Sequence, residues 1–239
     1  MKKCLIVRGG WDGHQPVEVS ERFKRILEAE GFSVEISETL DSFSDEEKLK
    51  SLHLIIPVWT MGEIPHEYVA AVSNAVASGV GIAGCHGGMC DAFRNDVLWQ
   101  FMTGGNWVAH PGGADVEFEV NISNSSSPLT AEIEDFKVTS EQYYLHVDPS
   151  VEVLATTTFP TVKWYHSTNG VVQVPVVWTK KWGHGRVYYN ALGHQDNIFD
   201  IPEAGELMKR GLLWAAAGKD EAVAKNLTIE EFASDKPMF

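Results

Sequence analysis

The sequence predicts a three-layer α/β sandwich, formed by residues 1–239 as one domain with a mostly parallel central sheet. Three observations predict this fold. A length of 239 residues suits one α/β domain, and 44% hydrophobic with 22% charged residues is an ordinary globular composition. The first half of the chain also alternates short apolar runs with helical periodicity. Such alternation implies right-handed crossovers and a parallel sheet that helices cover on both faces.

The first half supplies the strands and helices of this core. Residues 3–8 are a short apolar run that stops at Gly9 and Gly10, which predicts a buried strand. Pro16 then opens a helix that Gly31 ends, with apolar residues at helical spacing between them. By the same criteria, strands are expected at residues 33–37, 53–58 and 80–83, and helices from Ser44 with its capping-box partner Glu47, from Pro65 to Gly79, and from Asn95 through Met102.

The pattern changes from Asp115 onward. Val116, Phe118 and Val120 alternate with charged residues, which predicts a half-exposed strand. Further elements are expected as strands at residues 152–158, 171–179 and 186–192, a last strong helix at 202–217, and a C-terminal tail at about 218–239. The second half is therefore expected to add antiparallel strands to the α/β core.

Charge and cysteine content restrict the partners and the location. The chain has 19 Lys and Arg against 33 Asp and Glu, a net charge of −14, which disfavours nucleic acid and anionic membranes as partners. Its 3 cysteines argue against a disulfide framework. No apolar stretch approaches the ~20 residues of a membrane span, and the run at residues 4–7 is too short for a signal peptide. We therefore expect a soluble, cytoplasmic protein and, from its size and class, a homodimer.

The densest functional signal is the glycine-rich turn at residues 84–88, directly after a buried strand. A strand-to-helix turn of this kind projects one side chain at the carboxyl edge of the sheet, and it needs small residues two positions before and after that side chain. His86 has glycine at both of those positions, whereas Cys85 has alanine on one side and glycine on the other. The two glycines favour His86 as the projecting residue. Cys85 would then point into the core as a small apolar group.

Four of the 9 histidines lie in glycine-rich turns, and we expect them to converge: His14, His86, His110 and His194. Loops that follow parallel strands share one edge of the sheet, where open α/β folds bind ligands. His194 also begins a His-x-Asp sequence, which can bring Asp196 close enough to hold the tautomer of an imidazole. Glu141 and Tyr143 add a carboxylate and an aromatic ring from a polar segment.

A wider set of short motifs follows the same order along the chain: Gly10-Trp11 with His14, Gly84-Cys85-His86, Gly104-Gly105 with His110-Pro111, Glu141 with Tyr143, Pro175-Val176-Val177-Trp178, and Gly183-His184-Gly185-Arg186 before Leu192-Gly193-His194. Together they resemble the ThuA-like (trehalose-utilisation) family, from Val7 to about Ala217. The resemblance implies a flavodoxin-like sheet, similar to that of class I glutamine amidotransferases. It also implies a role in carbohydrate metabolism, linked to disaccharide breakdown through oxidised sugars.

The sequence differs from the amidotransferases at the residues that carry their chemistry. Those enzymes carry a nucleophilic cysteine at the turn and a later His-x-Glu, whereas here His86 fits the turn and the later pair is His194 with Asp196. An imidazole cannot replace a thiolate in thioester chemistry, so we do not expect a glutaminase. If Cys85 occupied the projecting position instead, Cys85, His194 and Asp196 would form a nucleophilic triad.

Three hypotheses for the function remain. In the first, His86 and His194 act as acid and base on a small sugar or keto-sugar, with Glu141 or Asp196 orienting them, since an unperturbed imidazole titrates at ~6.5. The residues expected to bind such a small-molecule carbohydrate, by stacking on its ring or meeting its hydroxyls, are Trp11, His14, Trp107, His110, Tyr143 and Trp178.

The second hypothesis is a metal-dependent hydrolase or isomerase. Three histidines and a carboxylate suit zinc or another divalent ion, although no close spacing such as His-x3-His is present. The third is a non-catalytic, sugar-binding accessory protein, because a fold can keep a pocket without its chemistry. The sequence does not separate the third hypothesis from the first.

Overall fold

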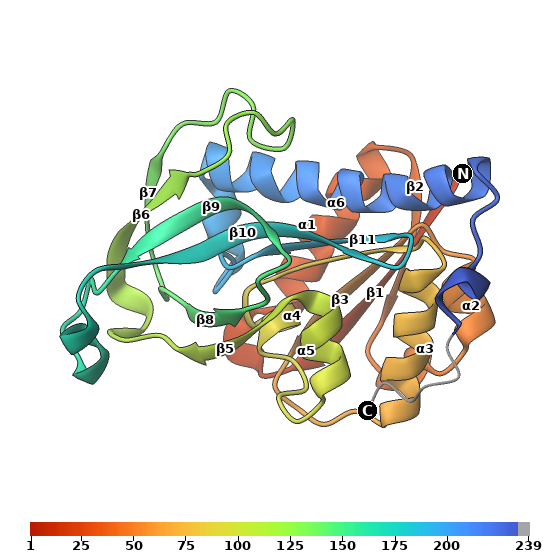
Figure 1. Ribbon diagram of the computed structural model, residues 1–239, viewed down its shortest axis with the longest axis horizontal. Coiled ribbons are helices and arrows are strands. Elements are labelled where there is room, and N and C mark those ends of the chain that lie inside the picture. The colour runs from red at the N-terminus through yellow and green to blue at the C-terminus, as the bar shows by residue number, and fades with distance from the viewer. Residues whose placement is uncertain (234–239) are drawn as a thin grey trace.

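The computed structural model describes residues 1–233, which form a three-layer α/β sandwich with an antiparallel extension at one end (Figure 1). The main sheet has nine strands in the order β2-β1-β3-β4-β11-β10-β9-β6-β7, and β5 pairs with β8 in a separate two-stranded sheet. Within residues 1–233, no helix combines the length and the apolar character needed to cross a membrane.

Five neighbouring strands form the parallel part of the sheet. The apolar runs of the first half predict four of them, whereas the strand at 186–192 was expected among the antiparallel strands and instead pairs in parallel with its neighbour β4. They are β1 (Lys2–Gly10), β2 (Phe32–Ser37), β3 (Leu54–Thr60), β4 (Gly81–Cys85) and β11 (Gly185–Asn190). Helices cover both faces, and the central strands are therefore apolar on both sides, with Leu5, Ile6 and Val7 fully buried in β1.

Two long helices lie on one face of the sheet and four shorter ones on the other (Figure 1). The first face carries α1 (Pro16–Ala29) and α6 (Pro202–Ala224), and the second carries α2 (Glu46–Lys50), α3 (His66–Ala77), α4 (His86–Cys90) and α5 (Val97–Thr103). Two helices begin one residue beyond the expected cap: Asp45, not Ser44, caps α2, and Asp96, not Asn95, caps α5. A carboxylate is an equally good acceptor for the free N–H groups of a first turn.

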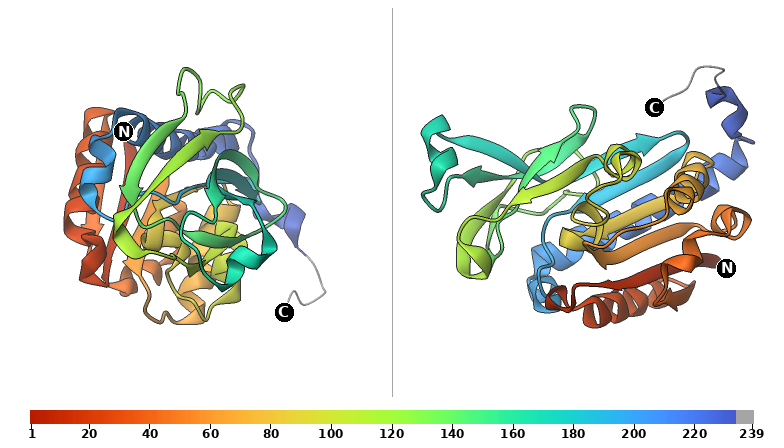
Figure 2. Two further views of the ribbon diagram at one scale, coloured as in Figure 1. Left: turned by 90° about the vertical axis from the view of Figure 1, so that its left-hand side faces the viewer. Right: turned by 90° about the horizontal axis from the view of Figure 1, so that it is seen from below.

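The second half of the chain extends the sheet with antiparallel strands that stand out to one side of the core (Figure 2). The extension consists of β6 (Val116–Ile122), β7 (Phe136–Ser140), β9 (Glu152–Phe159) and β10 (Val172–Trp182), and the small sheet consists of β5 (Gly105–Ala109) and β8 (Tyr144–Val147). The strands β5, β7 and β8 have no strand prediction in the sequence: they are as short as β4 but lack its continuous apolar run.

The last helix is longer than the sequence predicts. It continues to Ala224, so the part of the expected tail that runs from residue 218 to residue 224 is helical. The sequence suggests that Gly218 ends the helix, but Gly218 is buried inside α6, where the helix crosses Gly79. A β-carbon at Gly218 would lie 3.0 Å from Arg186 Cγ. Glycine at this position therefore serves close packing and does not end the helix. Residues 234–239 of the expected tail lie outside the described residues.

Candidate functional site

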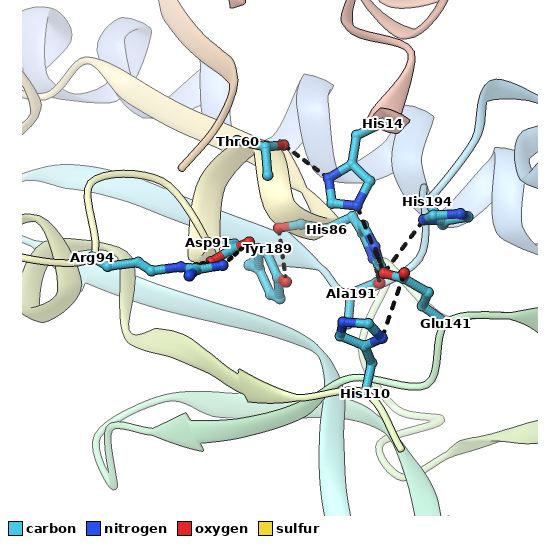
Figure 3. Close-up of polar contacts among 10 residues, drawn as sticks. All are labelled: His14, Thr60, His86, Asp91, Arg94, His110, Glu141, Tyr189, Ala191 and His194. Carbon is cyan, nitrogen blue, oxygen red and sulfur yellow. Dashed lines mark hydrogen bonds and ion pairs between the residues drawn. The ribbon is translucent and has the colours of Figure 1, made fainter. Parts of the chain in front are cut away.

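The candidate site lies at the carboxyl edge of the parallel strands, where the loops after β1, β4 and β11 meet. These loops carry His14, His86 and His194, and the antiparallel half of the chain contributes Glu141 and His110 (Figure 3). Glu141 lies between β7 and β8, and His110 follows β5. The four histidines that the sequence predicted to converge do come together in the structure around one carboxylate.

Glycines shape the turn that presents His86. The backbone of His86 has φ +46°, in the left-handed region that non-glycine residues seldom adopt. A β-carbon at Gly84 would lie 2.7 Å from Met89 Cβ, and one at Gly88 would lie 3.1 Å from Val58 Cα. The chain can therefore make this turn only with small residues on either side of His86, as the motif predicts.

Contacts fix the imidazole of His86 on three sides. Its Nδ1 lies 2.7 Å from the carbonyl oxygen of Ala191, and its Nε2 lies 3.1 Å from Glu141 Oε2. Its ring stacks on Tyr143 with a centroid distance of 3.7 Å. The hydroxyl of Tyr189 also donates to the carbonyl oxygen of His86, at 3.0 Å. The ring is buried and held in one orientation.

The carboxylate of Glu141 is the centre of the cluster (Figure 3). Its Oε2 lies 3.1 Å from His86 Nε2, 3.4 Å from His194 Nδ1 and 3.6 Å from His14 Nε2. Its Oε1 lies 3.5 Å from His110 Nδ1. One buried carboxylate therefore faces four imidazoles.

Burial and these contacts together lower the pKa of both His86 and Glu141, which favours the neutral imidazole and the ionised carboxylate. Burial lowers the pKa of His86 to about 4, because the charged imidazolium loses its hydration, and this effect exceeds the opposing contact with Glu141. Burial by itself raises the pKa of Glu141, but polar contacts with His14, His194 and His86 outweigh it and hold that pKa well below its usual range. Near neutrality the site therefore combines an ionised carboxylate with a neutral His86.

The cysteine at the turn takes no part in the cluster. Cys85 is buried beneath the turn, with its Sγ next to Gly193, and burial raises the pKa of its thiol to about 12. A thiol with such a pKa is not a nucleophile at neutral pH. The structure therefore does not support the alternative triad of Cys85, His194 and Asp196.

Asp196 does not orient His194, which corrects the sequence-based expectation. Both carboxylate oxygens of Asp196 accept hydrogen bonds from Arg22 of α1, at 2.6 and 2.7 Å. The backbone N–H of Asp196 donates to the side chain of Gln15. Asp196 thus ties the segment after His194 to the first helix, and its role is structural.

Trp178 lies in the core and not in the site, which corrects a second expectation. It is fully buried in β10, its ring packs on Tyr189, and its Nε1 donates to the carbonyl oxygen of Thr103 at 3.1 Å. Neither face of the indole ring is free for a ligand. The other residues expected to contact a ligand all lie around the cluster: Trp11, His14, Trp107, His110 and Tyr143.

A cavity of about 220 Å³ opens next to the cluster, and its wall contains Met61, Asp91 and Arg94 besides those five residues and Glu141. Sites for drug-sized ligands typically measure 300–1,000 Å³, so this volume favours a small ligand. A neighbouring hollow of about 380 Å³ shares Trp107 and His110 with it and extends toward Trp164. The imidazoles of His86 and His194 do not line the cavity itself.

The sequence analysis missed Asp91 and Arg94. Asp91 is buried, and Arg94 pairs with it through Nε and Nη2 at 2.5 and 3.0 Å. The guanidinium of Arg94 also lies over the ring of Trp107, 4.4 Å from its centroid. The signal was present as an Asp-x-x-Arg directly after the short helix that follows the turn, but spacing alone does not show that this pair faces the cavity.

Comparison with known proteins identifies the family. A sequence family described as ThuA, trehalose utilisation, matches residues 3–215. The match covers most of the chain, and the chain therefore belongs to the ThuA family. A search of curated proteins gives no match.

Solved structures support the same fold. A ThuA-like protein from Bacteroides uniformis ATCC 8492 is similar with 20% identity and a TM-score of 0.72, covering 90% of this chain and 91% of that one. A ThuA-like protein from Parabacteroides merdae ATCC 43184 has 19% identity and a TM-score of 0.69, covering 91% and 90%. A protein described as cytoplasmic, from Salmonella typhimurium LT2, has 11% identity and a TM-score of 0.61, covering 90% and 99%. At these identities the likeness shows the fold, which is flavodoxin-like with added antiparallel strands.

Proposed function

We propose that this protein is an enzyme of carbohydrate metabolism that transfers protons on a small sugar or keto-sugar. Membership of the ThuA family supports a carbohydrate-related role. The observation that carries the chemistry is the ionised carboxylate of Glu141, which faces four imidazoles beside a small cavity. Imidazoles are the side chains best suited to exchange protons near neutral pH.

The cavity wall divides the cluster into groups that meet the ligand and groups that support them. His14, His110 and Glu141 line the cavity, whereas His86 and His194 contact Glu141 without lining it. Contacts that lower the pKa of Glu141 also make it a weak proton acceptor. The proton acceptor is therefore an imidazole on the cavity wall, and His86 and His194 position the carboxylate.

The remaining wall suits a sugar ring. Trp11, Trp107 and Tyr143 provide aromatic faces for its C–H surface, and Asp91 and Arg94 provide charged groups for its hydroxyls. The reaction that fits these groups is removal of a proton next to the ketone of a keto-sugar. That step begins both isomerisation and elimination, and it needs no nucleophile on the protein.

A panel of keto-sugars and oxidised disaccharides tests the proposal, with products followed by mass spectrometry. Wild-type protein should convert at least one member of the panel. Glu141→Gln should lose about 100-fold or more in rate, because the carboxylate orients the cavity imidazoles His14 and His110 and stabilises the imidazolium that forms when one of them accepts the proton. His146→Gln is the matched control, since His146 is exposed on β8 and away from the cluster. Binding of these sugars without any conversion would instead establish an accessory, sugar-binding protein.

A further inference from the structure

The spacing of the atoms around Glu141 matches a metal-binding site. His14, His86, His194 and Glu141 each offer one ligand atom, and these four atoms lie within 4.8 Å of one another. Two ligands at 2.0–2.1 Å from a tetrahedral zinc ion lie about 3.4 Å apart. The three imidazole nitrogens lie 3.1, 3.4 and 3.6 Å from Glu141 Oε2, close to that separation, and all lie within 4.8 Å of one another.

The orientation of His86 shows why a cation fits between these atoms. A carbonyl oxygen only accepts hydrogen bonds, so Nδ1 of His86 must carry the proton that it shares with Ala191. Nε2 of the same ring faces the carboxylate oxygen of Glu141, 3.1 Å away, and unless Nε2 also carries a proton it presents a lone pair to that oxygen. Two acceptors that face each other at this distance need a cation or a proton between them.

The outer contacts of the imidazoles are those of metal ligands. Metal-binding histidines donate their second ring nitrogen to a carbonyl, a carboxylate or another polar group, which fixes the ring and its tautomer. His86 has Ala191 in this position, and Nδ1 of His14 lies 2.9 Å from the hydroxyl of Thr60. Within residues 1–233, the inward nitrogens His14 Nε2 and His194 Nδ1 are buried and have no hydrogen-bond partner.

We propose that His14, His86, His194 and Glu141 bind a divalent transition-metal ion of the zinc type. Three imidazoles and one carboxylate are a ligand set that zinc favours, and all four ligands sit on a fixed scaffold of strand ends. The carboxylate reduces the charge of the ion, and burial protects the site from competing water.

This inference concerns the site of the proposed function and deepens it. His14 and Glu141 belong both to the ligand set and to the cavity wall, so an ion bound there would lie beside the sugar. A divalent ion held by these four groups would supply Lewis acidity if the oxygen of a ketone joined it as a fifth ligand, and this would make the neighbouring proton easier to remove. The cavity imidazole of His110 would then remain free to accept that proton.

Titration of the full-length protein with metal alone tests the proposal. The protein is stripped with a chelator and then titrated with Zn²⁺ by calorimetry and with Co²⁺ by visible absorption. We expect one equivalent of either ion per chain and the absorption bands of Co²⁺ in a nitrogen- and oxygen-ligated site. Loss of an outer contact costs 10–100-fold in metal affinity, so loss of a ligand in Glu141→Gln or His194→Gln should cost at least about 100-fold.

Two further variants show whether the effect is specific. His110→Gln removes the fourth imidazole, which faces the other oxygen of Glu141 and lies outside the ligand set, and His146→Gln removes an exposed histidine. His146→Gln should keep the Zn²⁺ affinity of the wild type within a few-fold, and His110→Gln, which removes only an outer contact of Glu141, should lose less affinity than either ligand variant. Circular dichroism checks that each variant is folded. Because two ligand variants are made, the test still holds if one of them does not fold.

The outcomes separate this inference from the proposed function. Absence of stoichiometric binding, or equal affinity in wild type and in a folded ligand variant, overturns the metal site and leaves a proton between Glu141 and His86. Conversion of a keto-sugar by metal-free protein would in that case still support the proposed function. Stoichiometric binding that depends on Glu141 and His194 supports the metal site, even if no sugar in the panel is converted.

Discussion

Substitution of Gly87 by alanine should disturb the site more than the fold. A β-carbon at Gly87 would lie 2.5 Å from Nδ1 and 2.6 Å from Cε1 of His14, where ordinary contacts begin at 3.4 Å. The ring of His14 must therefore move by about 1 Å, and the side chain of Thr60, whose Cγ2 would lie 2.9 Å from the new β-carbon, must also yield, which disturbs the alignment of His14 with Glu141. A displacement of 1 Å in a catalytic group can cost about 100-fold in rate.

The expected loss of stability in Gly87→Ala is small. Overpacking costs about 1–3 kcal/mol, and replacing glycine by alanine inside a helix returns about 1 kcal/mol. The free energy of unfolding should therefore fall by roughly 0–2 kcal/mol. Gly31→Ala is the matched control: its φ of +82° strains an alanine by about 1–2 kcal/mol, but nothing lies within 4 Å of its β-carbon, and it lies between α1 and β2, away from the carboxyl edge of the sheet.

Urea denaturation of both variants, together with the rate of keto-sugar conversion, checks this reasoning. Both variants should be destabilised to a similar degree, and only Gly87→Ala should lose about 100-fold in rate. Equal and undiminished rates in the two variants would show that the position of His14 does not matter for the chemistry.

Three further predictions follow from the placement of other residues. Asp196→Asn should lower the free energy of unfolding by about 1–2 kcal/mol, because it weakens two partly buried, charge-assisted hydrogen bonds to Arg22; urea denaturation measures this, and intact stability with abolished turnover would make Asp196 catalytic after all. Cys85→Ala should keep the wild-type rate, since the thiol is buried beneath the turn; a large loss of kcat would restore the nucleophilic triad. The pKa of Asp148 is lowered, since contacts with Lys180 and Ser150 outweigh the opposing effect of burial. Its pairing therefore stabilises the fold above a pH of about 4 and is lost as the pH falls below that. In acid denaturation Asp148→Asn should thus lose more stability at pH 7 than at pH 2, and an equal loss at both pH values would contradict the assignment.

The part of the site that depends on parallel strands could be predicted from the sequence. His14 and His86 each follow a strand that the sequence predicts in the parallel core, and parallel strands end at one edge, so their loops were expected to meet. The glycines around His86 favoured it over Cys85 as the projecting residue. His194 follows β11, which was expected among the antiparallel strands but is parallel to β4, so topology alone did not place it.

The sequence identified the site residues of the antiparallel half as candidates, but it could not predict where they lie in the fold. Glu141 and His110 belong to the region of β5, β7 and β8, short strands for which the sequence gives no clear periodicity. Their approach to the histidines depends on how this region folds back over the edge of the sheet. Nothing in the local sequence around Glu141 specifies that long-range arrangement.

The two misplaced residues show where local reasoning fails. The spacing of His194 and Asp196 favours a local pair, but the partner of Asp196 is Arg22, 174 positions earlier in the chain. Trp178 was grouped with the aromatic residues expected to stack on a sugar ring, although β10 is covered on both faces at that position. Sequence spacing identifies polar and aromatic groups, whereas the contacts of each side chain depend on packing between distant elements.

The central claim, that the Glu141 cluster moves a proton on a sugar, is tested most directly by solvent exchange. Proton NMR in D₂O follows the exchange of the proton next to the ketone of a keto-sugar, in the presence of wild type, Glu141→Gln or His146→Gln. We predict rapid exchange with wild type and His146→Gln and a loss of about 100-fold or more with Glu141→Gln. Equal exchange with all three proteins, or conversion of the sugar without exchange at that carbon, would contradict the account.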